Sequence, residues 1–535
     1  MSAHVVRNAA GPDVAWRDGR LVDPRTIGPD VIEIDAGGAT VLPGFIDAHH
    51  HAGLAALYGG AQPLVAPAVT DIASLQAAVA AAAASSASEW VVVSEWNEER
   101  LAERRPPTRA ELDEAAPGRP VFAMHYSCHR AVVSSKALEI LGIDRHTPDP
   151  FGGVIERGRG GVPNGLLLER AMADAEGRAR ASLVATDAEG FLSRLSRHYR
   201  DIARAGITHV IDAMVPEDMA VLWEEADRRG AVIVPTTIMP AAARGGYFDP
   251  PFTALDGRPT GESRGNLRIG PMKLVFDGAP VCAMCMSWWQ AGGVMLSALA
   301  MTLRQRSWDT LRTSMSVKPT LGRELRSGIM LYDPSLARKI TEEARARGFD
   351  LAIHATGNAA AELAIDSFAQ LEGRAGRARI EHGTFLDREQ IRRVADLGVA
   401  IVTQPPFLRL PTIAHAPPIP GLPYLPLRWL LDAKVTVGAS SDFPVTAFDP
   451  LAGIRAAVER RTMLEELHEP EQRIELDEAV ALYTSGAAKA AGCFDERGSL
   501  DPGKRADVVI LDQALTPESL DRVRVKRTFI GGVEI

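Results

Sequence analysis

Cysteine is scarce in this chain, which has four cysteines in 535 residues. So few cysteines in a long chain argue against a disulfide framework and indicate a reducing compartment. Cys282 and Cys285 have CxxC spacing, but no second cysteine pair completes a zinc ribbon, and the flanking sequence lacks a βαβ redox pattern. We interpret both as small apolar residues near a pocket or the core.

Basic charge is also limited. The chain has 59 Lys and Arg residues against 68 Asp and Glu residues, which gives a net charge of −9 and a pI near 5.9. Dense clusters of Lys and Arg are missing, so the sequence argues against a nucleic-acid surface. We therefore expect no nucleic acid among the partners.

Long hydrophobic runs are missing as well. The N-terminus lacks a basic region followed by an apolar stretch, so we expect no signal peptide. The alanine-rich run 77–87 is too short and too broken by serine to span a bilayer, and it predicts an exposed or lightly packed helix. These features predict a cytoplasmic protein without a membrane partner.

Hydrophobic residues make up 46% of the chain and charged residues 24%. This composition is typical of a globular protein with a large core. The length suggests about three or four domains of average size, although a single barrel domain is longer than the average domain. Residues 1–43 and 496–535 have the same texture of short β-like runs separated by Gly, Asp and Pro. We expect one small β domain built from both ends of the chain.

The middle of the chain alternates apolar strands with helical patterns, which is typical of βαβ units and a parallel sheet. A (β/α)8 TIM barrel fits this α/β pattern better than an open sheet. The eight expected strands are 44–49, 206–213, 231–238, 270–278, 350–357, 378–384, 399–405 and 435–442.

Two segments are too long to be simple connections within such a barrel. We expect residues 55–205 to form an insertion domain after the first strand, with α+β structure of its own. The barrel then consists of 44–54 plus 206–495. A second insertion at about 279–334 would lie over the C-terminal strand ends, where long structured loops often shape a substrate site.

Three histidines end the first barrel strand, in "LPGFIDAHHHAGL". Successive side chains on a strand point to opposite faces, so His49 and His51 can point together into the barrel mouth. His50 should point away from it. Two imidazoles on one face can chelate a metal, although an H-x-H pair alone is a weak signal.

The ends of other expected strands carry further metal-binding side chains. Lys273 lies in the fourth strand, His354 in the fifth and His382 in the sixth, and Asp442 ends the eighth. Catalytic groups in barrels come from these strand ends, and histidine with carboxylate is a ligand set that suits zinc and similar divalent ions. The sequence therefore predicts a metal site.

Lys273 lies in the apolar strand "PMKLVF", where burying an unpaired ammonium group would be costly. A buried lysine can lose its proton, and the neutral amine can add carbon dioxide to form a carbamate that bridges two metals. The alternative is an ion pair with a neighbouring acid such as Asp277. The residues alone leave both open.

The motifs "PGFIDAHHH", "KLVFDG", "IHATGN", "IEHG", "SSD" and "GSLDPGKRADVVILD" resemble the amidohydrolase superfamily. Within it they resemble the amidohydrolase-3 branch, which includes YtcJ-like and N-substituted formamide deformylase-like proteins. Residues 95–121 and 129–143 resemble the insertion of that branch. The resemblance covers nearly the whole chain, and the motifs occur in order.

This resemblance implies a distorted (β/α)8 barrel and a small β-sandwich domain formed by both termini. It implies two divalent metal ions, with zinc favoured. His49, His51 and Asp442 would bind one ion, and His354 and His382 would bind the other. Lys273, carboxylated, would bridge the two. Asp442 would act as general base and then general acid in metal-assisted hydrolysis.

Several residues near the expected pocket are candidate substrate-binding groups. His129 is a carbonyl or carboxylate donor on one interpretation and a structural histidine on the other. Packing is the simpler role for each of the rest taken singly. A nucleophilic pair of Cys128 and His125 lacks a third group to orient it. The other candidates are Glu95, Trp96, Gln404, Asn358, Trp288 and Trp289.

Two stretches depart from the branch pattern: Asn358 replaces the usual acid after the fifth-strand histidine, and "DGAPVCAMCMSWW" replaces an Arg-Thr-Ala stretch. We therefore predict the reaction class only, namely metal-dependent hydrolysis of a C–N bond in a non-peptide amide, formamide, cyclic amide or carbamate. Deamination, C–O hydrolysis, isomerisation or decarboxylation at the same site is the alternative. A catalytically silent scaffold is a third reading, although all six ligand positions are filled.

The expected partner is a small-molecule substrate. A homodimer is compatible with this architecture, and no sequence feature decides the oligomeric state.

Overall fold

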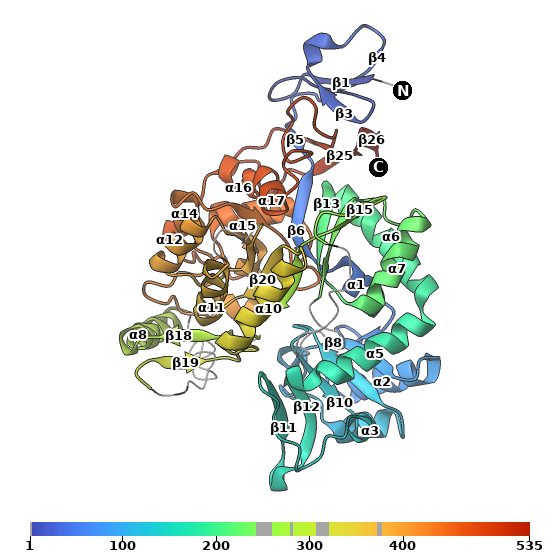
Figure 1. The fold of residues 1–535 in the computed structure, drawn as a ribbon, viewed down its shortest axis with the longest axis vertical. Helices are drawn as coiled ribbons and strands as arrows, with labels where there is room; N and C mark the ends of the chain where they lie inside the picture. Colours follow the sequence, from blue (N-terminus) through green and yellow to red (C-terminus); the bar gives the residue numbers. More distant parts are fainter. Residues whose placement is uncertain (1–2, 242–258, 279–281, 306–319, 321, 372–376) are drawn as a thin grey trace.

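The computed structural model describes residues 3–241, 259–278, 282–305, 320, 322–371 and 377–535. The fold is mixed α/β. Parallel strands at the centre carry the helices around them, the two chain ends form sheets on one side, and an inserted sheet lies on the opposite side (Figure 1).

The central strands form two five-stranded sheets, in the orders β15-β16-β14-β13-β6 and β17-β20-β21-β22-β23. Every pair in them is parallel except β15 with β16. The first sheet consists of β6 (Phe45–His50), β13 (Ile207–Val215), β14 (Thr236–Pro240), β15 (Ser263–Arg264) and β16 (Leu267–Ile269). The second consists of β17 (Met272–Val275), β20 (Leu351–Ala355), β21 (Arg379–His382), β22 (Ala400–Thr403) and β23 (Val437–Ala439).

All eight strands expected from the sequence are present, and within the described residues they form two sheets without a detected closure into one barrel. A few contacts join the sheets on both sides. Ala241 and Lys273 form an isolated parallel bridge, and the Asp442 N–H donates to the His49 carbonyl at 2.9 Å. The third strand starts later than expected, at Thr236, directly after Pro235. Proline has no N–H to donate to a ladder.

The chain forms two strand pieces here: β16 ends at Ile269, just before the expected fourth strand 270–278, and β17 lies within it. Gly270 and Pro271 lie between the two pieces. Because Pro271 cannot donate a ladder hydrogen bond, the pairing is broken at this point. The first piece pairs with β14 and the second with β20, so the break is where the chain passes from one sheet to the other.

Helices follow the strands, as the alternating pattern predicts. Two examples are α10 (Pro334–Ala346) and α12 (Arg388–Leu397). The Asp387 side chain and Gln390 form a capping box that starts α12. The other helices around these strands are α1 (Ala52–Tyr58), α6 (Ala188–Arg204), α7 (Glu217–Arg228), α11 (Asn358–Ala369), α14 (Leu427–Asp432), α15 (Pro450–Glu459), α16 (Leu476–Leu482) and α17 (Ser485–Ala490).

The inserted segment has its own six-stranded sheet, in the order β11-β12-β10-β9-β8-β7. The alanine-rich run is helical, as predicted, within α2 (Ile72–Ser85). The remaining helices of the segment are α3 (Arg109–Ala115), α4 (Ser135–Leu141) and α5 (Ala173–Thr186). Its strands are β7 (Gln62–Pro63), β8 (Val91–Trp96), β9 (Val121–His125), β10 (Arg130–Val133), β11 (Gly153–Arg157) and β12 (Pro163–Glu169).

The chain termini form two four-stranded sheets that lie together at one end of the molecule (Figure 1). One hydrophobic cluster, which includes Val6, Trp16, Val508 and Phe529, contains residues of both sheets. The first sheet has β1 (Ala3–Arg7), β2 (Val14–Arg17), β3 (Arg20–Val22) and β4 (Val31–Asp35). The second has β5 (Val41–Pro43), β24 (Val508–Leu511), β25 (Val525–Ile530) and β26 (Val533–Glu534).

The second expected insertion contains a hairpin of β18 (Met284–Met286) and β19 (Leu325–Ser327), with helix α8 (Trp288–Gln305) between them. Residues 279–281, 306–319 and 321 of this segment lie outside the described residues. Over the described ranges, no helix combines the length and apolarity that crossing a membrane requires.

Candidate metal centre

His49 and His51 lie where β6 runs into α1. Their ring centroids are 5.2 Å apart. His50 points the other way, with Nδ1 2.9 Å from Asp47 Oδ2 and Nε2 2.7 Å from His198 Nε2. The strand alternation read from the sequence therefore gives the observed orientation of the three side chains.

His354 and His382 approach this pair from the second sheet. The His354 and His382 ring centroids are 4.4 Å apart, and the His49 and His382 centroids are 4.9 Å apart. His354 lies in β20, and His382 is the last residue of β21, the neighbouring strand. Strands of both sheets thus direct imidazoles to one place.

Asp442 follows β23 and faces the histidines. Its Oδ1 is 3.1 Å from His51 Nε2 and 3.4 Å from His49 Nε2. Ligand atoms of His49, His382 and Asp442 all lie within 4.8 Å of one another, and all three residues are buried. This spacing can hold a metal ion.

The backbone at this site is strained. Asp442 has φ 54° and His382 has φ 73°, both in the left-handed region. Each costs on the order of 1–3 kcal/mol for a residue with a side chain, and such positions concentrate at functional sites.

Further side chains orient the metal-binding rings from behind. His49 Nδ1 hydrogen-bonds to the Glu381 carboxylate, which also accepts from Arg379 at 2.9 Å. His382 Nδ1 donates to Gln404 Oε1 at 2.7 Å. With Nδ1 occupied on both rings, Nε2 is the nitrogen available to a cation. The structure thus places Gln404, a candidate substrate residue, behind His382.

Burial keeps these histidines neutral. It lowers the pKa of His49 to about 3, with a further contribution from Lys273, and it also lowers the pKa of His354 and of His382. Burial raises the pKa of Asp442. The effect of His49, His51 and His382 is larger, and it keeps the pKa of this carboxyl below its ordinary value. The site therefore offers neutral imidazoles and an ionised carboxylate.

Lys273 is buried in β17, with 2% of its surface exposed. Burial lowers the pKa of its amine to about 8, against the opposing charges of Glu381 and Asp442. Among the described residues, no carboxylate oxygen lies within 4.0 Å of this amine. Lys273 is therefore not paired with Asp277, the alternative considered from the sequence.

Asp277 instead lies beside His354, with Oδ1 3.5 Å from Nε2. Burial raises the pKa of Asp277 to about 7. The carboxylate accepts three backbone N–H groups, from Ala283 at 3.0 Å, Thr356 at 2.9 Å and Gly357 at 2.8 Å.

The inserted segment reaches the site through His129 and Glu169. His129 Nδ1 lies 3.1 Å from Glu169 Oε2, and its ring centroid is 5.8 Å from that of His354. Burial lowers the pKa of His129, but Glu169, Asp277 and Asp442 more than compensate, so that the pKa rises. His129 is therefore a hydrogen-bond donor beside the predicted metal ligands.

The remaining candidates lie in different environments. Trp96 is fully buried, and its Nε1 donates to the Ala123 carbonyl at 2.9 Å. Glu95 is exposed at the end of β8, with φ 68°. Trp288 and Trp289, on α8, expose more than half of their surfaces. Asn358 binds the middle of β18, accepting from the Cys285 N–H and donating to the Cys285 carbonyl, both at 2.8 Å.

The cysteines are poor nucleophiles. Burial raises the pKa of Cys128 to about 12 and also raises that of Cys282. Both ring nitrogens of His125 are hydrogen-bonded to other groups, Nδ1 to Ser127 Oγ and Nε2 to Glu98 Oε2. These contacts disfavour a thiolate at Cys128.

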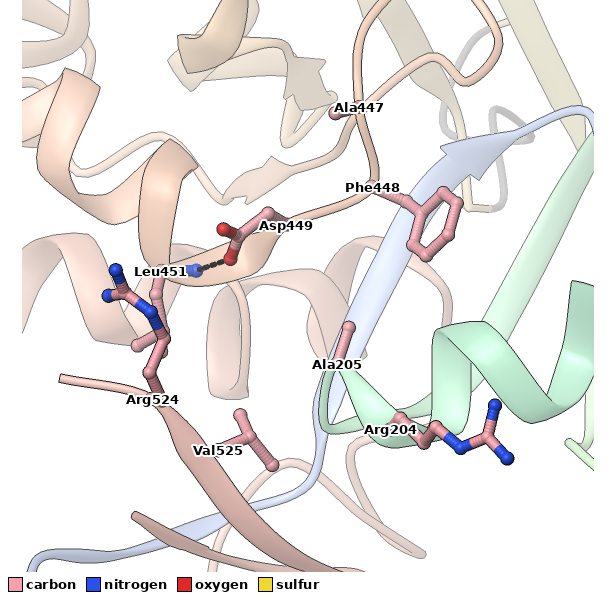
Figure 2. Close-up of a pocket in the computed structure, with 8 residues that line it drawn as sticks. All are labelled: Arg204, Ala205, Ala447, Phe448, Asp449, Leu451, Arg524 and Val525. Carbon is pink, nitrogen blue, oxygen red and sulfur yellow. Dashed lines mark hydrogen bonds between the residues drawn. The ribbon is translucent and has the colours of Figure 1, made fainter. Parts of the chain in front are cut away.

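A separate pocket of about 310 Å³ lies where α6 leads into β13 (Figure 2). Arg204, Phe448 and Arg524 are among its lining residues. This is the start of β13, whereas the histidine cluster lies at the opposite ends of the parallel strands. None of the predicted site residues lines this pocket.

Sequence reasoning missed Glu381, Arg379 and Glu169. Glu381 lies inside the quoted motif "IEHG", but its role depends on the contact with His49 across the sheets. Glu169 is 40 residues from His129, and only the antiparallel pairing of β10 with β12 brings the two together. The sequence carried no signal for that pairing.

The model of the amidohydrolase family matches residues 33–535. The chain belongs to the amidohydrolase family. The resemblance read from the sequence motifs is therefore confirmed.

Among amidohydrolase relatives, the chain is 30% identical over 525 residues to N-substituted formamide deformylase of Arthrobacter pascens, covering 94% of this chain and 90% of the relative. It is 27% identical over 529 residues to the amidohydrolase YtcJ of Bacillus subtilis, with the same two coverages. A crystal structure of a metal-dependent hydrolase from Pyrococcus horikoshii superimposes with a TM-score of 0.67 at 21% identity, covering 96% of this chain and 98% of that one. This last comparison establishes a shared fold.

Proposed function

We propose that this protein is a metal-dependent hydrolase that cleaves a C–N bond in a non-peptide amide, formamide, cyclic amide or carbamate. The observation that carries the proposal is the buried cluster of His49, His382 and Asp442, with ligand atoms within 4.8 Å of one another. The similarity to N-substituted formamide deformylase over 90% of that relative supports a small amide or formamide as the substrate.

The donor set fits a divalent cation. His49 and His382 are neutral because of burial, and Nδ1 of each is hydrogen-bonded to an acceptor. Ligand histidines in metalloproteins have this arrangement, which fixes the ring and leaves Nε2 for the metal. Imidazole nitrogen with carboxylate oxygen suits zinc.

We extend the proposal to two ions, one held by His49, His51 and Asp442 and one by His354 and His382. His354 Nε2 is 3.2 Å from Thr356 Oγ1, so Nδ1 is the nitrogen that would face the second ion. A carboxylated Lys273 would bridge them. An amine with its pKa lowered to about 8 is partly neutral at neutral pH, as carbamate formation requires.

When bound, divalent ions of this kind supply a water molecule with a pKa near neutrality. Asp442 would accept a proton, and its Oδ1, 3.4 Å from His49 Nε2 and 3.1 Å from His51 Nε2, supports this role. Ionised and buried, it would hold this proton and then pass it to the leaving nitrogen. His129 would donate to the substrate carbonyl, oriented by Glu169.

The proposal includes the architecture that supports the site. The two parallel sheets, linked by the Ala241–Lys273 bridge and the Asp442–His49 hydrogen bond, would be two parts of a distorted (β/α)8 barrel at 44–54 plus 206–495. The terminal sheets would form a β-sandwich domain of 1–43 plus 496–535, and 55–205 an insertion domain.

The test combines metal analysis with a panel of small amides, formamides, lactams and carbamates assayed with added zinc. We expect bound zinc and hydrolysis of at least one C–N substrate. Asp442→Ala should lower kcat by at least about 100-fold, because general acid–base catalysis contributes on the order of 10²–10⁴. Asp449→Ala, which changes a carboxylate outside the cluster, is the control.

Turnover of an ester, or a decarboxylation, without any C–N cleavage would assign the site to another reaction of the same centre. A protein that binds zinc but turns over nothing in the panel would favour the silent scaffold. If the protein binds no divalent ion, the proposal of a metal-dependent hydrolase is wrong.

A further inference from the structure

Helix α8 exposes its large apolar residues. In this helix, six such side chains have between 47% and 73% of their surface exposed. They are Trp288, Trp289, Met295, Leu296, Leu299 and Leu303. Isolated exposed apolar residues are ordinary, but a group of this size on one element indicates a binding surface.

The exposed residues form one stripe. Trp289, Leu296 and Leu303 are spaced by seven residues, which is close to two helical turns, so they lie above one another. The others lie beside them on the same face, within about a third of the helix circumference at 3.6 residues per turn. We call these six residues the α8 stripe.

The residues of α8 that are buried or packed most closely are small. A Cβ on Gly293 would lie 2.5 Å from Pro420 Cγ, so the helix packs closely against that segment. Ala298 and Thr302 are the buried residues within α8. A surface helix normally buries its large apolar residues and exposes its small or polar ones. In α8 the two buried residues are small, Val294 and Met301 are half-buried, and six other large apolar residues are exposed.

The apolar surface continues beyond the end of the helix. Arg304 and Gln305 both contact Glu466 Oε2, at 3.0 Å and 2.8 Å, which places the loop after α15 beside the end of α8. In this loop, Met463, Leu464 and Leu467 are each nearly half exposed.

The charge of α8 indicates which kind of partner binds the α8 stripe. Arg304 is the only charged residue in α8, and helices that lie on membranes are rich in lysine and arginine. A lipid surface is therefore disfavoured, particularly for a chain with a net charge of −9. An uncharged stripe is complementary to itself, because a two-fold axis brings the same patch of each copy together.

The area is close to what a stable dimer needs. With about 200 Å² for each fully exposed large side chain, the α8 stripe offers on the order of 700 Å². The exposed residues of the neighbouring loop add to this. A standard interface buries about 800 Å² per partner.

We propose that the α8 stripe is the interface of a homodimer, in which α8 of one copy packs antiparallel against α8 of a second copy across a two-fold axis. This inference does not depend on the metal centre or on the reaction. Helix α8 lies at the outer edge of the fold, beside β18 (Figure 1).

Sedimentation velocity of the full chain across micromolar concentrations tests the proposal. We expect wild type to sediment at twice the 57.4 kDa chain mass. Leu296→Glu with Leu303→Glu should weaken the dimer by at least about 100-fold, because two carboxylates would be buried without partners. Val221→Glu is the matched control, since Val221 is 68% exposed on α7, outside the stripe, and this variant should remain dimeric.

Circular dichroism melting checks that the glutamate variant is folded. If it is not, Leu296→Ala with Leu303→Ala is the second variant, and we expect a dimer about tenfold weaker. A wild type that is monomeric at all concentrations overturns the proposal, as does a folded stripe variant that dimerises as tightly as wild type. Flotation of wild type with phosphatidylcholine vesicles, lost in the stripe variant, would overturn it in favour of a lipid surface.

Discussion

At the scale of single residues, the site depends on groups that hold the predicted metal ligands in place. Gln404 is an example. Its Oε1 accepts from His382 Nδ1, and its Nε2 donates to Ser440 Oγ at 3.0 Å, so the amide is fixed at both ends. Fixing a ligand ring in this way typically contributes 10- to 100-fold to metal affinity.

Gln404→Met should therefore weaken zinc binding by about 10- to 100-fold, because His382 loses the acceptor that sets its orientation. Gln404→Glu keeps an acceptor at the same place and should bind zinc nearly as wild type does. Competition with a chelator measures both dissociation constants. Unchanged zinc affinity with a raised KM for substrate would instead show that Gln404 contacts the substrate.

Glu169 has a comparable role for His129. Glu169→Ala removes the carboxylate that holds His129 Nδ1 at 3.1 Å. We expect kcat/KM to fall by about 10- to 100-fold, because a misplaced donor no longer meets the substrate. Glu169→Gln keeps an acceptor and should recover part of the loss.

The control for Glu169 is Glu156→Ala, in β11 of the same sheet, where the side chain is exposed. Steady-state kinetics with the panel substrate provides the measurement. A Glu169→Ala protein with wild-type kinetics would mean that His129 is a structural histidine, the other interpretation drawn from the sequence.

At the scale of elements, Asn358 connects the start of α11 to the β18–β19 hairpin through two hydrogen bonds to Cys285. Replacing it with alanine leaves one backbone donor and one backbone acceptor without their partner, at a cost of about 1–3 kcal/mol.

Asn358→Ala should therefore open the hairpin locally. We expect amide hydrogen exchange in β18 and β19 to accelerate by about 10- to 100-fold, while α12 exchanges as before. Asn164→Ala, which removes an amide from β12 of the inserted sheet, should leave the hairpin unchanged. Equal exchange in wild type and Asn358→Ala would show that α8 and its packing hold the hairpin without this contact.

Glu98, just after β8, forms an ion pair with Arg130 of β10 in the inserted sheet. The Glu98 carboxylate lies 2.5 Å from Arg130 Nη2 and 3.1 Å from His125 Nε2. Burial raises the pKa of Glu98, but these two partners outweigh it and lower the pKa from 4.5 to about 2. A carboxyl with a lowered folded-state pKa stabilises the fold above its unfolded pKa, and this stabilisation is lost as the pH falls toward the folded pKa.

Glu98→Gln should therefore lower the free energy of unfolding at pH 7 by roughly 1–3 kcal/mol. The difference from wild type should shrink as the pH falls from 4.5 toward 2. Thermal melts at several pH values measure it, with exposed Glu89→Gln as the control of equal charge change. A difference that stays constant with pH would mean that the charge of Glu98 does not contribute.

At the scale of the whole molecule, the proposed ligands join the two central sheets. His49 comes from the first sheet, while His354, His382 and Asp442 come from the second or directly follow it. A cation bound between them would tie the sheets together at a place where the described residues show only isolated backbone contacts.

Removing the metal should therefore destabilise the entire fold. A ligand at about 1,000 times its dissociation constant stabilises the native state by about 4 kcal/mol, so chelation should lower the Tm and added zinc should restore it. The Asp442→Ala protein should show a smaller shift. A Tm that is the same with chelator and with zinc would contradict a metal bound across the sheets.

The sequence by itself determined the family, the strands and which of His49, His50 and His51 share a face. These follow from local rules, because strand alternation has a period of two and barrel chemistry gathers at strand ends. Expected strand boundaries were wrong where proline intervened, at Pro235 and Pro271.

Only the tertiary structure decided what lies behind and around those ligands. Gln404 behind His382, Glu169 beside His129 and the absence of a carboxylate partner for Lys273 within the described residues all depend on which strands become neighbours. The orientation of α8 is a similar case, since a stripe of large apolar residues reads the same from sequence whether it faces the core or the solvent. Strand pairing and helix packing depend on contacts between residues far apart in the sequence, and the local sequence pattern does not specify them.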